Sequence, residues 1–232
     1  RLSEVLPKGD LERWMSIYTA VIDSGGPVTF EEYAELLGRW FAVSVYPRAG
    51  DELTIFYHDI TERKRREANQ ELLVDISEDL SQLSSEEEII RTVGAKLAAH
   101  LKLTCYHYVD VDEERAEATI RHFWHALDVP SILGTYPIAG FIRPYALRSL
   151  RAGEPLIFND VQQELTGDLA ATAGLKAGTA AQKIAAYVAV PYSQDGRWKA
   201  YFAAADSSPR QWTSSEIDLL QEVAGRVFPR IE

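Results

Sequence analysis

Residues 38–47 read Gly-Arg-Trp-Phe-Ala-Val-Ser-Val-Tyr-Pro, and residues 55–67 read Ile-Phe-Tyr-His-Asp-Ile-Thr-Glu-Arg-Lys-Arg-Arg-Glu. The first run and the start of the second are rich in Val, Ile, Phe and Tyr, which is typical of β-strands. Ala49-Gly50-Asp51 lies between them and predicts the turn of a hairpin. The second run then becomes charged, which predicts that a strand passes directly into an exposed helix. Such an arrangement suits a protein that transmits a conformational change along its chain, and it needs no catalytic group.

The residues before this stretch predict one helix and one further strand. Apolar residues recur at helical spacing from Asp10 to Ser24, and Gly25-Gly26-Pro27 ends the pattern. Residues 27–33, 39–46 and 52–60 are then predicted as three antiparallel strands. A three-stranded sheet with one helix is marginally stable alone, so its open face is expected to be covered by another copy or by more of a parent protein.

The exit from the last of these strands, Asp-Ile-Thr-Glu-Arg-Lys at residues 59–64, resembles the C-terminal end of a PAS domain. The opening strands and short pocket-forming helices of that family are missing upstream. The resemblance therefore implies that residues 1–62 are the C-terminal part of a PAS domain. It also implies that Asp59 and Thr61 lock the strand exit to the following helix.

A helical connector is expected over residues 63–83. Its apolar residues are spaced by three, four and three positions, which is the seam of a parallel coiled coil and favours a homodimer: Leu73, Ile76, Leu80 and Leu83. The repeat is short, and a helix laid against its own domain is the alternative. The basic run at residues 63–66 has Glu62, Glu67 and Glu71 beside it, so i, i+4 ion pairing explains it and nucleic-acid binding is not expected.

Residues 84–232 predict a second domain of mixed helices and antiparallel strands. Ser84 with Glu87, and Thr213 with Glu216, have capping-box spacing before two amphipathic helices. Between these helices strands are expected at residues 103–111, 118–124, 155–158, 185–192 and 197–205, with a helix-containing loop at 137–150. The Ala- and Gly-rich stretch 170–186 is interpreted as a mobile loop or short helix near a pocket, acting as a lid or as a linker. The fold class is therefore α+β.

This second region is similar to a GAF domain over residues 70–230. The similarity rests on Pro-Leu-Ile-Phe-Asn-Asp-Val at residues 155–161, on the hairpin from Val190 to Ala205, and on Pro-Arg-Gln-Trp-Thr at residues 209–213. It implies a six-stranded antiparallel sheet with a ligand pocket on one face and dimerising helices on the other. Together with the PAS-like exit it points to the sensory region of a bacterial signal-transduction histidine kinase.

Aromatic residues gather in the region that lines the pocket in that family, and two arginines on the capping segment could meet an anionic ligand. The expected ligand-binding residues are Tyr106, His122, Trp124, Tyr136, Arg143 and Tyr145. His107 shares a strand face with Cys105, and that face could be core or pocket. The cyclic-nucleotide pattern of the family is not recognisable, so the cofactor or ligand stays unknown.

The sequence gives little support for covalent cofactor attachment, metal binding or catalysis. Cys105 is expected to be a buried structural thiol rather than the attachment point of a bilin, and His122 and His125 are expected on opposite faces of a strand, which argues against a shared metal site. The sequence shows no phosphate-cradling glycine loop, nucleophile elbow, cysteine pair or kinase catalytic motif.

Charge limits the possible partners further. The 232 residues carry a formal net charge of -11, which opposes binding to phosphate backbones and anionic lipid. One cysteine and no long apolar run favour a cytoplasmic setting, and the absence of an initial Met suggests that the chain is cut from something longer. The first hypothesis is thus a non-catalytic sensor, followed by a passive dimerisation scaffold without ligand, a tetrapyrrole or haem sensor of light or redox state, and an enzyme.

Overall fold

The computed structural model describes residues 8–50, 52–140, 142, 144–166, 170–194 and 196–231, without the side chains of residues 8–14, 144, 145, 170 and 171. It divides into two compact units, residues 1–68 and 69–232. This division lies inside the stretch predicted as a connector. Along the part of the chain that is described, no helix is both long and apolar enough to cross a membrane.

The first unit is a helix on a three-stranded sheet. Helix α1 (Lys8–Ser24) precedes strands β1 (Val28–Ala34), β2 (Arg39–Pro47) and β3 (Leu53–Asp59), which pair antiparallel in the order β1-β2-β3. Tyr18 and Val21 of α1 are buried against Val43 and Val45 of β2. The expected helix and three strands are therefore present.

The opposite face of this small sheet carries exposed aromatic side chains. Because neighbours along a strand point to opposite faces, Tyr46 and Phe56 lie on the side away from Val43 and Val45, and their rings meet edge to face at 5.9 Å. Both rings are more than two fifths exposed. Only one face of the sheet is thus covered within this unit.

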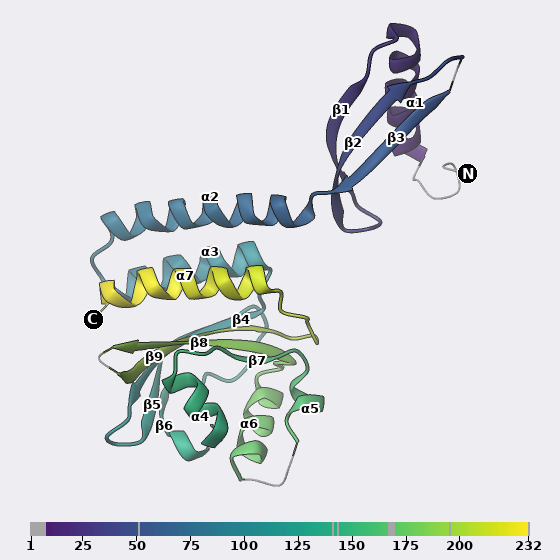
Figure 1. The fold of residues 1–232 in the computed structure, drawn as a ribbon. Helices are drawn as coiled ribbons and strands as arrows, with labels where there is room; N and C mark the ends of the chain where they lie inside the picture. The colour runs from purple at the N-terminus through teal and green to yellow at the C-terminus, as the bar shows by residue number, and fades with distance from the viewer. Residues whose placement is uncertain are drawn as a thin grey trace. The chain divides into compact units, whose positions relative to one another are not determined.

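The second unit is built around a six-stranded antiparallel sheet (Figure 1). Its strands lie in the order β6-β5-β4-β9-β8-β7. Their bounds are β4 (Cys105–Asp112), β5 (Glu117–His125), β6 (Gly134–Pro137), β7 (Leu156–Phe158), β8 (Ala186–Gln194) and β9 (Arg197–Asp206). Strand β6 was not expected from the sequence, since it has only four residues and begins at a glycine.

Helices cover both faces of this sheet. Of the longer ones, α3 (Glu86–Leu101) and α7 (Ser214–Ile231) pack on one face, called here the helix face, and α2 (Thr61–Gln82) from Asn69 onward lies over these two helices (Figure 1). The shorter ones lie on the other face, called the cavity face (Figure 1): η2 (Ile138–Gly140), α4 (Pro144–Arg151), α5 (Val161–Glu164) and α6 (Ala170–Ala181). The α+β class and the antiparallel sheet are confirmed.

Alternation along β4 assigns its residues to the two faces. Tyr106 and Tyr108 belong to the cluster of buried residues on the helix face, whereas Cys105 and Val109 belong to the cluster on the cavity face. His107 must therefore also point to the cavity face, because it lies two residues from each of the latter. This parity decides which side chains can reach a ligand.

The expected seam of α2 is used inside the chain. Ile76 is 0% exposed and Leu80 is also buried, both in the core formed with α3 and α7, and Leu73 and Leu83 pack against the same core. Ile76 and Leu80 thus have no surface left for a second copy, and the expectation of an intermolecular coiled-coil seam is wrong for them. A short apolar repeat specifies that a helix has an apolar face but does not specify the partner.

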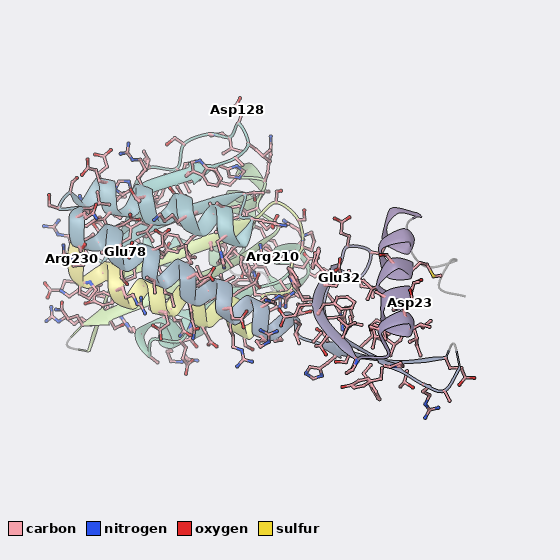
Figure 2. All side chains as sticks on the ribbon, turned by 90° about the horizontal axis from the view of Figure 1, so that it is seen from above. Asp23, Glu32, Glu78, Asp128, Arg210 and Arg230 are labelled. Carbon is pink, nitrogen blue, oxygen red and sulfur yellow. The ribbon has the colours of Figure 1, made fainter. Side chains whose placement is uncertain are left out.

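Charged groups of α3 and α7 hold the other sides of α2. Arg226 donates to the Leu73 carbonyl oxygen and to Ser77 Oγ, both at 2.8 Å, and Arg230 donates to the Leu80 carbonyl oxygen at 2.8 Å. Lys96 of α3 pairs with Asp75 at 2.7 Å. Figure 2 shows this layer of helices from above, with Arg230 and Glu78 labelled.

The two capping predictions have different outcomes. Thr213 and Glu216 form the expected box, since Glu216 Oε2 accepts from the Thr213 amide at 2.9 Å and Thr213 Oγ1 accepts from the Glu216 amide at 3.3 Å. The box predicted from Ser84 is wrong, because α3 begins after Ser85, whose side chain makes no capping hydrogen bond.

Candidate functional site

A cavity of about 330 Å³ lies on the cavity face of the six-stranded sheet. Strands supply its floor through His107, Ile120 and Tyr201, and α6 with the residue that follows it supplies one wall through Leu175, Thr179 and Gln182. A smaller space of about 80 Å³ shares His107, Thr179 and Tyr201 with it and extends toward α4. The volume lies at the lower end of the roughly 300–1,000 Å³ that is usual for small-molecule sites.

His107 is the polar group of the cavity floor. Its ring lies edge to face with that of Tyr201 at 6.2 Å, and its Nδ1 is buried without a hydrogen-bond partner among the described residues. Burial lowers the pKa of His107 to about 4, because the apolar surroundings disfavour the charged form. The imidazole is therefore neutral near pH 7.

Gln182 is the polar group at the end of α6. Its side chain is 3% exposed, and its Nε2 donates to the Pro130 carbonyl oxygen at 3.0 Å. This bond fixes the orientation of the amide and leaves Oε1 as an acceptor, which is buried and has no partner in the described part of the chain. A ligand that donates a hydrogen bond could satisfy it.

The C-terminal end of β5 holds the residue that follows α6. His125 Nε2 lies 2.8 Å from the Gln182 carbonyl oxygen, and His125 Nδ1 accepts from the Leu127 amide at 2.9 Å. Because Nδ1 accepts, Nε2 carries the proton and donates. His125 therefore supports the cavity wall from outside and is not a ligand-binding group.

Glycines form part of the cavity rim. Gly174 of α6 approaches η2 so closely that a Cβ there would lie 2.3 Å from the Gly140 carbonyl oxygen. Gly178, one turn later, also lines the cavity, but a Cβ at this position would meet no atom within 4 Å. These residues leave a wall without side chains, against which a flat group can lie.

Three of the expected ligand-binding residues lie on the helix face instead. Tyr106 stacks on Trp124 at 5.4 Å and on Phe202 at 5.8 Å, beneath α3. His122 pairs in register with Tyr108, and their rings are 6.4 Å apart. Tyr106, His122 and Trp124 therefore do not line the cavity beside α6, because each is one strand position away from a cavity-facing residue. His122 borders a separate open hollow with Ser85 and Arg121.

Of the remaining expected residues, Tyr136 lines the cavity from β6. Arg143 and the side chain of Tyr145 lie outside the described residues. Residues not singled out as ligand-binding from the sequence supply the floor and the α6 wall: His107, Ile120, Leu175, Thr179, Gln182, Ile184 and Tyr201. His107 lies two positions from Cys105 and therefore on the same face of β4. This was the sequence signal that could have predicted His107 as a residue of the cavity floor.

Cys105 lies beside this floor, but its thiol is inaccessible and unreactive. Its side chain is 0% exposed, and burial raises the pKa of its thiol to about 12. The thiolate is the reactive form of cysteine, so almost none of it exists near pH 7. This environment is that of a structural thiol.

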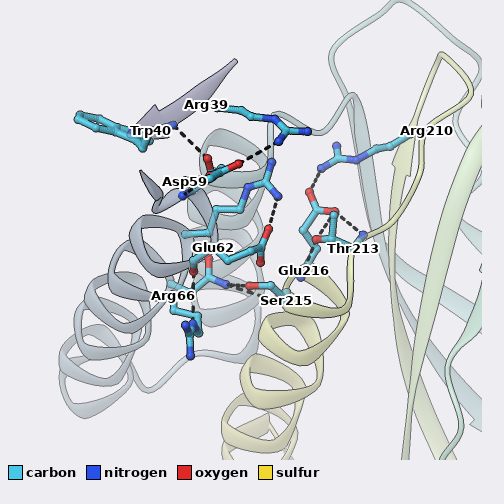
Figure 3. A network of polar contacts seen from close by, with 12 residues as sticks. Arg39, Trp40, Asp59, Glu62, Arg66, Arg210, Thr213, Ser215 and Glu216 are labelled. Atoms are coloured by element: carbon cyan, nitrogen blue, oxygen red, sulfur yellow. Dashed lines mark hydrogen bonds and ion pairs between the residues drawn. The ribbon is translucent and has the colours of Figure 1, made fainter. Parts of the chain in front are cut away.

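The contacts of Asp59 and Thr61 lie in the first unit and join the end of β3 to α2 (Figure 3). Asp59 accepts from the Thr61 amide and from Arg39, both at 2.9 Å, and Thr61 Oγ1 accepts from the Trp40 amide at 3.0 Å. The hydrogen bonds from Thr61, with help from Arg39, hold the pKa of Asp59 below its usual range.

The basic run at the start of α2 is paired as the sequence predicted, with one partner that was not expected. Arg63 pairs with Glu67 at 2.6 Å and Arg65 with Glu62 at 2.7 Å. Glu31 of β1 adds an ion pair to Lys64 at 2.6 Å and one to Arg63. The two ion pairs of Glu31 thus fasten residues 61–68 to the small sheet.

A second polar cluster fastens α2 within the other unit. Asn69 donates to Ser215 Oγ at 3.0 Å and accepts at Oδ1 from His100 Nε2 at 2.7 Å, so one amide joins α2, α3 and α7 (Figure 3 shows Ser215). Burial lowers the pKa of His100. Asn69 lies directly after the point where the two units divide.

Comparison with known proteins identifies the second unit. The family model described as "GAF domain" matches residues 85–227. No curated protein matches the chain significantly. The matched residues are more than half of the chain and contain the six-stranded sheet and most of the helices that cover it.

Solved structures with the same fold come from different functional classes. A phycocyanobilin-bound GAF domain from a cyanobacterial phytochrome is 16% identical, with a TM-score of 0.58 over 68% of this chain and 91% of that one. A GAF domain of a phosphoenolpyruvate-protein phosphotransferase from Coxiella burnetii is 11% identical, with a TM-score of 0.56 over 71% and 92%. The free methionine-R-sulfoxide reductase of Neisseria meningitidis is 15% identical, with a TM-score of 0.55 over 70% and 87%. At these identities the likeness shows the fold alone.

Proposed function

Because this chain belongs to the GAF domain family, we propose that it is a non-catalytic sensory module that binds a small molecule in the cavity beside α6. The observation that carries the proposal is the cavity itself, which is largely apolar and contains two buried polar atoms, His107 Nδ1 and Gln182 Oε1, without partners among the described residues. This combination of apolar walls and few polar groups is typical of a ligand site.

The alternatives fit the cavity less well. A passive scaffold would fill this space with its own side chains, which the about 330 Å³ argues against. A covalently attached tetrapyrrole would need a reactive cysteine, whereas Cys105 is buried with a thiol pKa of about 12. The same burial removes Cys105 from any thiolate-based enzyme mechanism.

Helix α2 is the element that we propose carries the signal. Its residues 61–68 are fastened to the small sheet by Asp59, Thr61 and Glu31, and its later residues are fastened to α3 and α7 by Asn69, Arg226 and Arg230. A change in the packing of α3 or α7 on the sheet would therefore move α2, whose first residues are fastened to the small sheet. This is a population shift between two packings, and it does not require the intermolecular seam expected from the sequence.

The finer assignment is also a proposal. The Asp-Ile-Thr-Glu-Arg-Lys exit and the three antiparallel strands support a PAS-derived first unit, residues 1–62, followed by a connector at 63–83 and the GAF domain at 84–232. Such a chain would be cytoplasmic and belong to a two-component histidine kinase. The expected homodimer would need a surface other than Ile76 and Leu80.

Native mass spectrometry of the full chain, as purified and after exposure to a metabolite extract, tests ligand binding. We expect a bound mass that is lost in Gly178→Leu, where the new side chain occupies the rim of the cavity, and kept in Gly225→Leu, a matched helical glycine of α7 whose Cβ also meets no atom within 4 Å. No bound mass under either condition would contradict the proposal. The same spectra report whether the chain is a homodimer.

Hydrogen exchange tests the coupling through α2. We expect ligand to change exchange at residues 61–68 in the wild type but not in Thr61→Val, which removes the acceptor for the Trp40 amide. Thr29→Val on β1 is the control, because its hydroxyl bonds to Ser44 at the sheet surface and not to α2 in the described part of the chain. An unchanged response in Thr61→Val would argue against this route.

A further inference from the structure

The polar atoms of the cavity restrict the chemistry of its ligand. Gln182 Oε1 can only accept a hydrogen bond, since Nε2 of the same amide is committed to the Pro130 carbonyl oxygen. A partner for Oε1 must therefore be a donor. Thr179 offers no such donor, because its hydroxyl already donates to the Leu175 carbonyl oxygen at 2.8 Å.

The described walls of the cavity disfavour a charged ligand. Among the described residues that line the cavity, none is Lys, Arg, Asp or Glu, and burial keeps His107 neutral near pH 7. An anion or a cation held there would lose its hydration without gaining a counter-ion, which is strongly unfavourable. The described lining thus favours a ligand without net charge.

The shape of the cavity favours a flat molecule. Gly140, Gly174 and Gly178 form a rim without side chains, while Tyr136 and Tyr201 supply aromatic surface. Ring systems pack well on such surfaces. The volume of about 330 Å³ has room for one or two rings with small substituents, and is small for the four rings of an open-chain tetrapyrrole.

We propose that the cavity selects an uncharged, planar molecule of one or two rings that donates a hydrogen bond to Gln182 Oε1 and pairs with His107 Nδ1. This inference rests on the proposed sensory function and names its ligand class. Because the acceptor lies at the end of α6, occupation would tie together this helix and the floor strand β4.

A matched pair of probes tests the donor requirement on the full chain. Indole and benzofuran have nearly the same size and shape, but indole carries an N–H donor where benzofuran carries an oxygen. We expect ligand-observed NMR titration to give indole about tenfold tighter binding, as one well-placed hydrogen bond supplies. Indole-3-carboxylate, which adds a negative charge, is expected to bind much more weakly than indole.

Two variants place the effect in the cavity. Gln182→Met keeps an unbranched side chain of similar length but removes the acceptor, so the preference of indole over benzofuran should disappear while benzofuran binding stays. Gly178→Leu should abolish binding of both probes, and Gly225→Leu should leave both unchanged. A preference that persists in Gln182→Met would overturn the role of this residue.

The outcomes separate this inference from the proposed function. Equal binding of indole and benzofuran, both lost in Gly178→Leu, would overturn the donor requirement and leave a ligand-binding cavity. Tighter binding of indole-3-carboxylate, again lost in Gly178→Leu, would overturn the uncharged class alone. Failure of all three probes, with a metabolite still retained in the native mass spectrum, would overturn the ligand class but not the sensory function.

Discussion

The two faces of the six-stranded sheet are built from alternate residues of the same strands but have opposite properties. On the helix face, α3 and α7, with α2 over them, cover a continuous core, and a space enclosed between α3, α7 and the sheet measures only about 20 Å³. On the cavity face, short helices leave about 330 Å³ beside α6. The difference teaches that long helices with apolar stripes support the sheet, whereas a short helix of alanine and glycine makes room for a ligand.

The largest effect is expected where the helix face is fully packed. Ile76→Ala should lower the free energy of unfolding of the second unit by about 3–4 kcal/mol, because it opens a cavity under α2 that the core cannot fill. Urea unfolding of the full chain measures this. Val74→Ala, at a position 60% exposed on the same helix, is the control and should stay within about 0.5 kcal/mol of the wild type.

A matching substitution on the cavity face gives a comparison for Ile76→Ala. Leu175→Ala removes a side chain that already borders an open space, so its cost should be well below that of Ile76→Ala. Equal costs would break the proposed contrast between the faces.

The next effect is a pH dependence that comes from His107. Its pKa is about 4 in the folded chain and about 6.5 when unfolded, so the unfolded state binds the proton first as the pH falls. Stability is therefore lost between about pH 6.5 and pH 4, by at most about 3 kcal/mol, and is unaffected above this range. Urea unfolding at pH 8, 5.5 and 4.5 should show a smaller loss in His107→Leu than in the wild type; identical profiles would contradict a buried neutral imidazole.

A smaller loss is expected for Gly94→Ala on the helix face. The new Cβ would lie 2.2 Å from the ring of Tyr106, which stacks between Trp124 and Phe202 and has little freedom to move. Thermal unfolding should show a destabilisation of about 2 kcal/mol, although alanine is the better helix former. Tyr106→Leu in the same chain should relieve most of the added cost, and full additivity of the two changes would argue against the contact.

The smallest effect has the opposite sign and lies on the cavity face. Gly178→Ala places its Cβ in open space within α6 and should stabilise the chain by up to about 1 kcal/mol through helix propensity. Gly225→Ala in α7 is the matched control and should give a similar gain. A loss at Gly178 like that at Gly94 would show that α6 packs as tightly as the helix face.

Local patterns predicted most of the elements of this fold. The alternation of strand residues, the hairpin of β8 and β9, and the capping pair Thr213 and Glu216 depend on neighbouring residues, and all three were correct. Strand β6 was not predicted, because it forms by pairing with β5, a segment that does not adjoin it in the sequence. The resemblance to a GAF domain then predicted that these strands form one antiparallel sheet.

The site was harder to predict, because it depends on which face of each strand meets which helix. Tyr106 and Trp124 are aromatic residues of the correct strands, but they lie one position from the cavity. His107 was placed on the same face as Cys105, yet nothing nearby in the sequence states which helices cover that face. Gln182 follows an alanine-rich helix and contacts Pro130, a residue 52 positions away.

The packing of α2 has a consequence for how such chains can be recombined. The family match begins at residue 85, yet the compact unit begins at Asn69, and residues 72, 76 and 80 belong to its core. A chimaera joined at residue 85 would leave the stripe of α3 and α7 that faces α2 open to water, and would tend to aggregate. The unit that evolution or an engineer can exchange is therefore longer than the unit that sequence similarity recognises.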